Sequence, residues 1–176
     1  MAAVLAVVGA IIGGIAVWWW RAQQVKGAAD SVIDAAGKAR GMISRARFRQ
    51  RAGQSVLAGV DSPGMAAATL LYSLAALRKP VALADEKQID QMLEAICQMN
   101  AKDREDALAF AAWASGQVAD TNDIVRRFLP LWTRSLESGP RRDLVGMATV
   151  ITKLHGEPTD AQAAVVRRLR EGLIGE

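Results

Sequence analysis

Residues 63–96 read PGMAAATLLYSLAALRKPVALADEKQIDQMLEAI, and this segment carries the clearest structural pattern of the chain. Leucines recur at three- and four-residue spacing along its first half, which is the period of a helix with one buried face. Pro80 ends that run, and a second apolar run begins near Asp85. Ser62 and Pro63 are typical of a helix start, where serine caps the backbone and proline occupies the first turn. The segment therefore predicts a helical hairpin.

The same pattern returns 77 residues later, in residues 140–173, PRRDLVGMATVITKLHGEPTDAQAAVVRRLREGL. The matching pairs are Pro63/Pro140, Leu70/Met147, Leu74/Ile151, Leu77/Leu154, Ala84/Ala161, Ile89/Val166, Met92/Leu169 and Ile96/Leu173. We therefore expect two related hairpins that face each other and close one core, with a third and a fourth helix between them. A segment of about 125 residues is long enough to bury such a core.

Helix signals continue through the rest of residues 52–176. The acid-rich segment 103–106 suits the positive end of a third helix. Asn122 is expected to begin the fourth helix and Pro130 to kink it. Gly139–Pro140 is expected to break the chain between the fourth and the fifth helix. Thr159 is expected to cap the sixth helix. Since no stretch alternates with period two, we predict an all-α domain of about six helices.

This layout resembles the TerB-like domain of the tellurite resistance protein TerB family, over about residues 60–175. In that family the loop of each hairpin carries Asp-Gly and further acids that are associated with metal binding. The first loop of this chain has Arg78 and Lys79 at the Asp-Gly positions, then Asp85 and Glu86, and the second has His155 and Gly156, then Glu157 and Asp160. The resemblance implies the fold. Because a basic pair would repel a divalent cation, we predict no cofactor and at most weak binding of Ca²⁺, Mg²⁺ or Zn²⁺.

Residues 2–20, AAVLAVVGAIIGGIAVWWW, contain no charged side chain. As a helix they would span roughly 30 Å, the thickness of a bilayer core. Trp18, Trp19 and Trp20 suit the headgroup boundary, with Arg21 directly behind them. We therefore predict a transmembrane helix at residues 1–20. The alternative is a cleaved signal peptide, which the missing basic start and the bulky end disfavour.

Two glycines in this stretch, Gly9 and Gly13, have the spacing that lets membrane helices approach closely. They are candidate packing residues against a partner or a second copy of the chain.

The positive charge of the chain is concentrated in residues 21–51, which carry a net charge of +6, whereas residues 52–176 carry −2. Anionic lipid headgroups are the nearest partner for such a segment, at about 1 kcal/mol per basic side chain. The candidate contacts are Arg40, Arg45, Arg47, Arg49 and Arg51. Nucleic acid is the disfavoured alternative, because Phe48 is the only aromatic residue among these arginines.

The charge distribution also predicts topology. Basic residues directly after a span remain on the cytoplasmic side, which places residues 52–176 in the cytoplasm, at a bacterial inner membrane. A single cysteine, Cys97, agrees with a reducing compartment. Residues 21–51 also show a heptad-like spacing from Val25 to Ala46, which fits either a self-associating stalk or an amphipathic helix lying on the membrane or on the domain.

A membrane span, a linker and a TerB-like domain together resemble the front part of membrane-anchored J-domain co-chaperones of the DjlA type. The His-Pro-Asp tripeptide of a J domain does not occur here, because the single histidine, His155, is followed by Gly156 and Glu157. The resemblance therefore implies an anchored helical module without the chaperone-stimulating function.

Catalytic chemistry finds little support in the sequence. Cys97 could act as a nucleophile with His155 as its base, but a thiol on an apolar helix more often packs as a small hydrophobe. No glycine-rich phosphate loop occurs. We therefore expect a protein that is not an enzyme and takes no small-molecule substrate.

The sequence as a whole predicts a single-pass, membrane-anchored accessory or scaffold protein, a small subunit or assembly factor of a membrane complex. Its expected partners are anionic lipids and other membrane protein subunits or a second copy of itself. The alternative is a metal- or tellurite-stress protein that binds a metal through the remaining acids.

Overall fold

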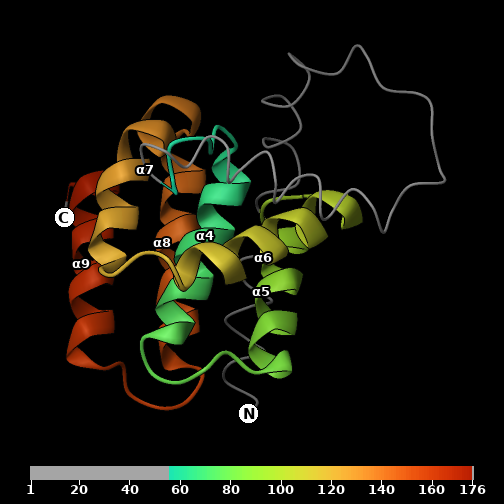
Figure 1. Ribbon diagram of the computed structural model, residues 1–176. Coiled ribbons are helices and arrows are strands. Elements are labelled where there is room, and N and C mark those ends of the chain that lie inside the picture. Colours follow the sequence, from blue (N-terminus) through green and yellow to red (C-terminus); the bar gives the residue numbers. More distant parts are fainter. Residues whose placement is uncertain (1–55, 176) are drawn as a thin grey trace, which may run out of the picture.

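The computed structural model describes residues 56–175, and this part of the chain is a bundle of six helices without strands (Figure 1). The helices are α4 (Pro63–Ala76), α5 (Leu83–Ala95), α6 (Ala101–Ser115), α7 (Thr121–Ser135), α8 (Ser138–Lys153) and α9 (Asp160–Ile174). The prediction of an all-α domain with about six helices is confirmed for these residues.

Two predicted segments, residues 1–20 and 21–51, lie outside the described residues. The same holds for Gly9, Gly13, the three tryptophans, Arg21 and the five candidate lipid-contacting arginines. Within residues 56–175, none of the helices combines the length and the apolar character that crossing a bilayer requires.

Helix α4 is the centre of the bundle. It packs against α5, α6, α7 and α8, while α9 packs against α7 and α8 (Figure 1). Consecutive alanines in α4, Ala66–Ala68, are buried and let the neighbouring helices approach closely. Trp132 of α7 is fully buried, and its Nε1 donates a hydrogen bond to the backbone oxygen of Pro63 over 3.3 Å. This bond fixes the start of α4 to helix α7.

The predicted repeat is visible in the helix boundaries. Helices α5 and α9 begin at residues 83 and 160, which differ by the predicted 77 positions. Leu70, Leu74, Ile89 and their repeat partners are buried. Leu77 departs from the prediction, because α4 ends at Ala76 and the leucine follows as the C-cap with 38% of its surface exposed.

The helix starts follow the capping signals at α4 and α9, with a shift at α7. Ser62 and Thr159 accept hydrogen bonds from the backbone at Met65 and Gln162, as predicted. Helix α7 begins one residue earlier than expected, because Asp120 accepts a bond from the Asn122 backbone N–H over 2.8 Å.

Two prolines occupy positions inside helices. Gly139–Pro140 lies in the first turn of α8 and is not the break that we predicted, since a proline in a first turn removes no helical hydrogen bond. The break falls at residues 136–137. Helix α7 continues through Pro130, and the hydroxyl of Thr133 donates to the carbonyl oxygen of Leu129 over 2.9 Å.

Candidate functional site

The loops of the two hairpins meet at one end of the bundle, below α4 and α8 in Figure 1. Arg78, in the first loop, donates a hydrogen bond to the backbone oxygen of Glu157, in the second, over 2.7 Å. A second contact joins the two hairpins, because Nε2 of His155 lies 2.6 Å from Oδ1 of Asp85 at the start of α5. Arg78 and His155 occupy equivalent positions of the repeat. We call this set of four residues the loop clasp.

Asp85 is the buried member of the loop clasp, with 4% of its surface exposed. Burial raises the pKa of its carboxyl group, but a hydrogen bond from the Ala82 backbone N–H at 3.1 Å and the contact with His155 outweigh it, so that the pKa is lowered. The ammonium group of Lys79 contributes less, because it lies 3.9 Å away and is half-exposed. Asp85 is therefore held as a carboxylate.

Gln162 is the repeat equivalent of Asp85 and makes a second contact between the hairpins. Its Nε2 donates to the backbone oxygen of Leu74 over 2.9 Å, and its Oε1 accepts from the Thr159 backbone N–H over 3.0 Å. The sequence analysis did not single out Gln162. The spacing of Thr159 and Gln162 is that of a capping box, which signals the local bond but not the distant one to Leu74.

The structure brings together only some of the residues that the family resemblance indicated. Arg78, Asp85, His155 and Glu157 meet in the loop clasp. Glu86 and Asp160 take no part in it: Glu86 is partly exposed on α5, and Asp160 is exposed at the start of α9. Among residues 56–175, no three His, Cys, Asp or Glu side chains form a group that could hold a metal ion. The described arrangement offers an Asp–His pair flanked by cations.

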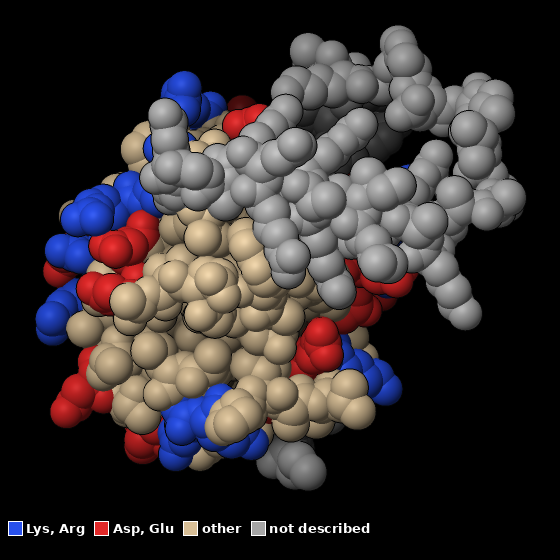
Figure 2. All heavy atoms as spheres, viewed as in Figure 1, with Lys and Arg blue, Asp and Glu red and all other residues tan. Residues whose placement is uncertain are grey.

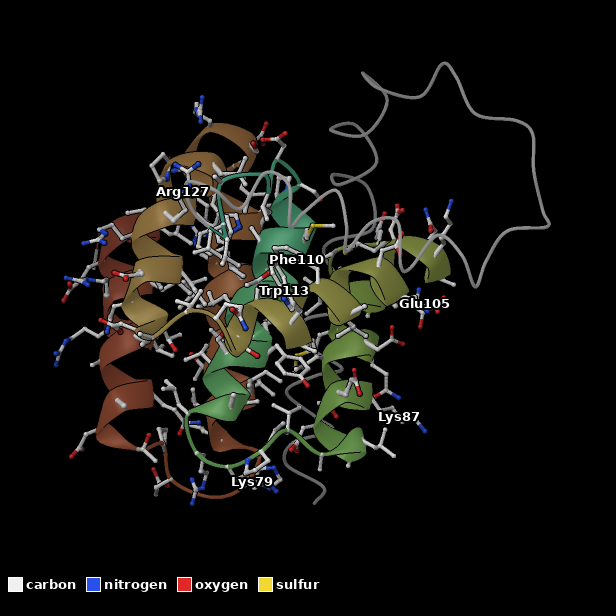
Figure 3. The ribbon with its side chains drawn as sticks, viewed as in Figure 1. Lys79, Lys87, Glu105, Phe110, Trp113 and Arg127 are labelled. Carbon is white, nitrogen blue, oxygen red and sulfur yellow. The ribbon has the colours of Figure 1, made fainter. Side chains whose placement is uncertain are left out.

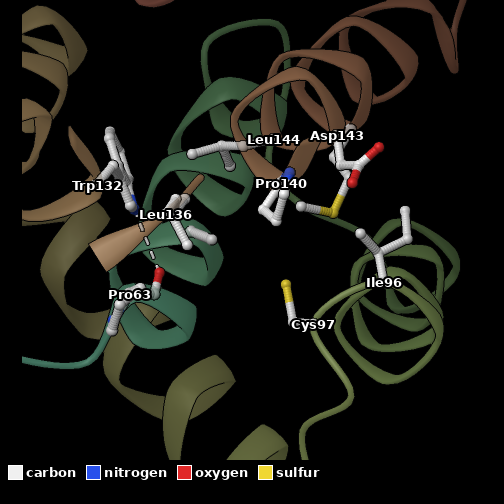
Figure 4. Close-up of a pocket in the computed structure, with 10 residues that line it drawn as sticks. Pro63, Ile96, Cys97, Trp132, Leu136, Pro140, Asp143 and Leu144 are labelled. Atoms are coloured by element: carbon white, nitrogen blue, oxygen red, sulfur yellow. Dashed lines mark hydrogen bonds between the residues drawn. The ribbon is translucent and has the colours of Figure 1, made fainter. Parts of the chain in front are cut away.

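Cys97 lies in a different place, beside a small apolar hollow between the starts of α4 and α8 and the end of α5 (Figure 4). The thiol is buried, and this burial, with the charge of Asp143 nearby, raises its pKa to about 12. Helix α5 separates this hollow from the loop clasp, and its 13 residues correspond to about 20 Å. The structure therefore does not bring Cys97 and His155 together as a nucleophile and its base.

An ion-pair cluster joins α5 and α6 on the surface. Arg104 of α6 pairs with Asp90 at 2.8 Å and with Glu94 at 3.1 Å, and it donates to the backbone oxygen of Met99. These contacts fix the start of α6 against α5. They are structural contacts at the opposite end of α5 from the loop clasp.

No protein-family model, curated protein or solved structure matches this chain. The TerB-like resemblance therefore stays a prediction from the sequence, and the function is argued from the site.

Proposed function

We propose that the described domain is a non-catalytic docking platform of a single-pass membrane protein, and that the protein is an accessory subunit or assembly factor of a membrane complex. The observation that carries this proposal is the loop clasp. Two side chains that would bring chemistry to the hairpin loops, Asp85 and His155, contact each other, and Arg78 binds the backbone oxygen of Glu157, so that both contacts join the two hairpins.

The loop clasp has the properties of a structural element. Its members come from both hairpins, and Asp85 has its two oxygens engaged by His155 and by the Ala82 backbone. Gln162 adds a buried bond across the same boundary. At this boundary Asp85 and Gln162 are buried and have hydrogen-bond partners, which favours a single arrangement of the hairpins, as a platform for a partner needs.

The surface supports docking as well. Figure 2 shows a neutral area on one face of the domain, with basic and acidic side chains interspersed around it. Trp113 of α6 lies near the centre of the same view (Figure 3) and is only partly buried, and its ring lies tilted against that of Phe110, with 5.6 Å between the ring centroids. Partly exposed tryptophans are frequent anchors in protein interfaces.

The membrane part of the proposal comes from the sequence. The apolar residues 2–20 and the net charge of +6 in residues 21–51 support a cytoplasmic domain attached to a bacterial inner membrane. Anionic lipids, other membrane subunits or a second copy of the chain are the proposed partners.

The alternative function, a metal- or tellurite-stress protein, is favoured by one observation, the adjacency of Asp85 and His155. A metal ion at this pair would have to displace their mutual contact and approach Arg78 and Lys79. We therefore place it second.

The test is purification of the tagged, full-length chain from native membranes after an alkaline carbonate wash, with quantification of the proteins that stay bound. We expect the chain to resist the wash and to retain a membrane protein, or a second copy of itself, in a fixed ratio. A control chain without residues 2–20 should wash off. Release of the full-length chain would refute the anchoring, and a retained chain without any companion would refute the docking role.

A further inference from the structure

The loop between α4 and α5 carries an unusual combination of side chains. Leu83 is 85% exposed and Leu77 is 38% exposed, and they are the exposed large apolar side chains of residues 56–175. Between them stand Arg78, Lys79 and Pro80, and residues 77–84 contain no acid. We call residues 77–83 the leucine loop. Figure 3 shows Lys79 at the extreme end of the bundle, where this loop projects.

The leucine loop is held in place on both sides. Arg78 is bound to the backbone of Glu157, and Asp85 accepts a hydrogen bond from the Ala82 backbone N–H. Leu83 is the first residue of α5, so its backbone belongs to a regular helix. Its exposure is thus a fixed feature of the fold. A leucine held in water adds no burial free energy to the domain, so it is available for apolar contact with a surface that meets this loop.

We propose that the leucine loop inserts Leu83 into the headgroup region of an anionic bilayer, where the ammonium group of Lys79 and the guanidinium N–H groups of Arg78 that do not bind Glu157 contact lipid phosphates. This inference rests on the proposed function, because the predicted span and basic segment would keep the domain beside a membrane. Tethering of this kind makes a weak second contact effective, since the local concentration of lipid is high.

Charge and shape favour a bilayer over a protein partner. The carboxylate of Asp85 is buried and paired, so the loop itself presents positive charge. Nearby, α8 ends with the cation Lys153, whereas the α8–α9 loop adds the exposed acid Glu157 and α9 begins with the exposed acid Asp160, so the attraction for anionic lipid centres on the leucine loop. A projecting leucine that follows two cations in the same loop suits the boundary of headgroups and acyl chains, whereas protein interfaces use clustered anchors in pockets.

The experiment uses the full-length chain in vesicles, with an environment-sensitive fluorophore on Leu83→Cys. The native Cys97 is buried and should not react. The matched control carries the label on Ser138→Cys, an exposed position at the other end of α8. In equimolar phosphatidylcholine and phosphatidylglycerol, we expect a blue shift at position 83, and quenching by lipids with a spin label near the headgroup. Position 138 should show neither.

Two further measurements separate the electrostatic contribution to lipid binding from the apolar one. In phosphatidylcholine alone the shift at position 83 should fall, and in anionic vesicles it should weaken in high salt, where screening is stronger. Position 83 remaining in water in anionic vesicles overturns the inference. So does an equal response at both positions, and so does shielding of position 83 only in native membranes, which would assign the loop to a protein partner.

The two proposals fail separately in these measurements. A chain that resists the carbonate wash while its position 83 stays in water keeps the proposed anchoring and loses this inference. A chain that washes off while its position 83 responds to anionic vesicles keeps this inference and loses the anchoring.

Discussion

Asp85 joins two roles in one side chain, the cap of α5 and the bond between the hairpins. The Asp85→Asn variant keeps the shape and removes the charge that faces His155. We expect the free energy of unfolding to fall by about 1–3 kcal/mol at neutral pH, the typical range for a hydrogen bond to a charged group. Urea denaturation followed by circular dichroism measures this difference.

The pH dependence of that difference has a definite sign. Folding lowers the pKa of Asp85, so its contribution is present above the unfolded pKa of about 3.9 and is lost as the pH falls through the lower folded value. The gap between the wild type and Asp85→Asn should therefore shrink between about pH 5 and pH 2. A gap that stays constant over this range would show that shape, and not charge, matters at this position.

The Asp85–His155 pair also allows a direct test of the metal chemistry that the family resemblance implies. Because the pair is engaged internally and lies beside Lys79, calorimetry with Ca²⁺, Mg²⁺ or Zn²⁺ should detect no stoichiometric micromolar binding. The His155→Ala variant is the control for any weak heat. Stoichiometric binding that disappears in this variant would promote Asp85, Glu157 and their acidic neighbours to ligands.

At the scale of the helices, two glycines allow a matched test, because an alanine substitution should affect the stability of the domain differently at each of them. A Cβ on Gly146 of α8 would meet open space, whereas a Cβ on Gly172 of α9 would come within 2.6 Å of Cδ2 of Leu129 on α7. Gly146→Ala should stabilise the domain by about 0.4–1 kcal/mol. Gly172→Ala should lose that gain, or destabilise, because Leu129 must move.

Thermal unfolding of both variants measures the difference, and the double variant Gly172→Ala with Leu129→Ala isolates the contact. If the two single variants stabilise equally, α7 and α9 are packed less closely than described.

Much of the helical architecture is predictable because its signals are local. The capping residues Ser62 and Thr159 predict where α4 and α9 begin, and the 77-residue repeat predicts that the second hairpin has the helix pattern of the first. Leu77 was misplaced because periodicity does not reveal that α4 ends one residue earlier. The contact of Gln162 with Leu74 was missed because it depends on how the hairpins pack, and sequence spacing carries no such information. The family resemblance singled out Arg78 and His155 as positions of a degenerate metal motif, whereas the structure places them in contacts between the two hairpins.

At the scale of the whole molecule, the loop clasp and the predicted membrane segment have separate roles. The clasp joins the two hairpins at one end of the domain, and residues 1–51 carry the predicted anchor and basic segment beside the membrane contact proposed for the leucine loop. A domain that needed only a tether could use any apolar stretch of about 20 residues. This chain instead has the Gly9–Gly13 spacing and a basic segment with five closely spaced arginines.

The Gly9→Leu and Gly13→Leu variants test whether the span makes specific contacts. Both keep the segment apolar, so insertion should survive. Close approach of another helix should be lost, at about 1–2 kcal/mol for a membrane helix contact. Cross-linking in native membranes, with quantification of self-association and of bound proteins, measures this loss.

The basic segment is tested by glutamate at Arg45, Arg47 and Arg49, which reverses the charge and leaves the helical domain untouched. Since residues 56–175 carry their own core, this variant and the glycine variants should melt like the wild type while losing partners. The deciding comparison is truncation after residue 51. If the substituted chains keep every partner and the truncated chain loses them all, the contacts predicted for the span and the basic segment are refuted, and the docking surface proposed for the helical domain binds the partners alone.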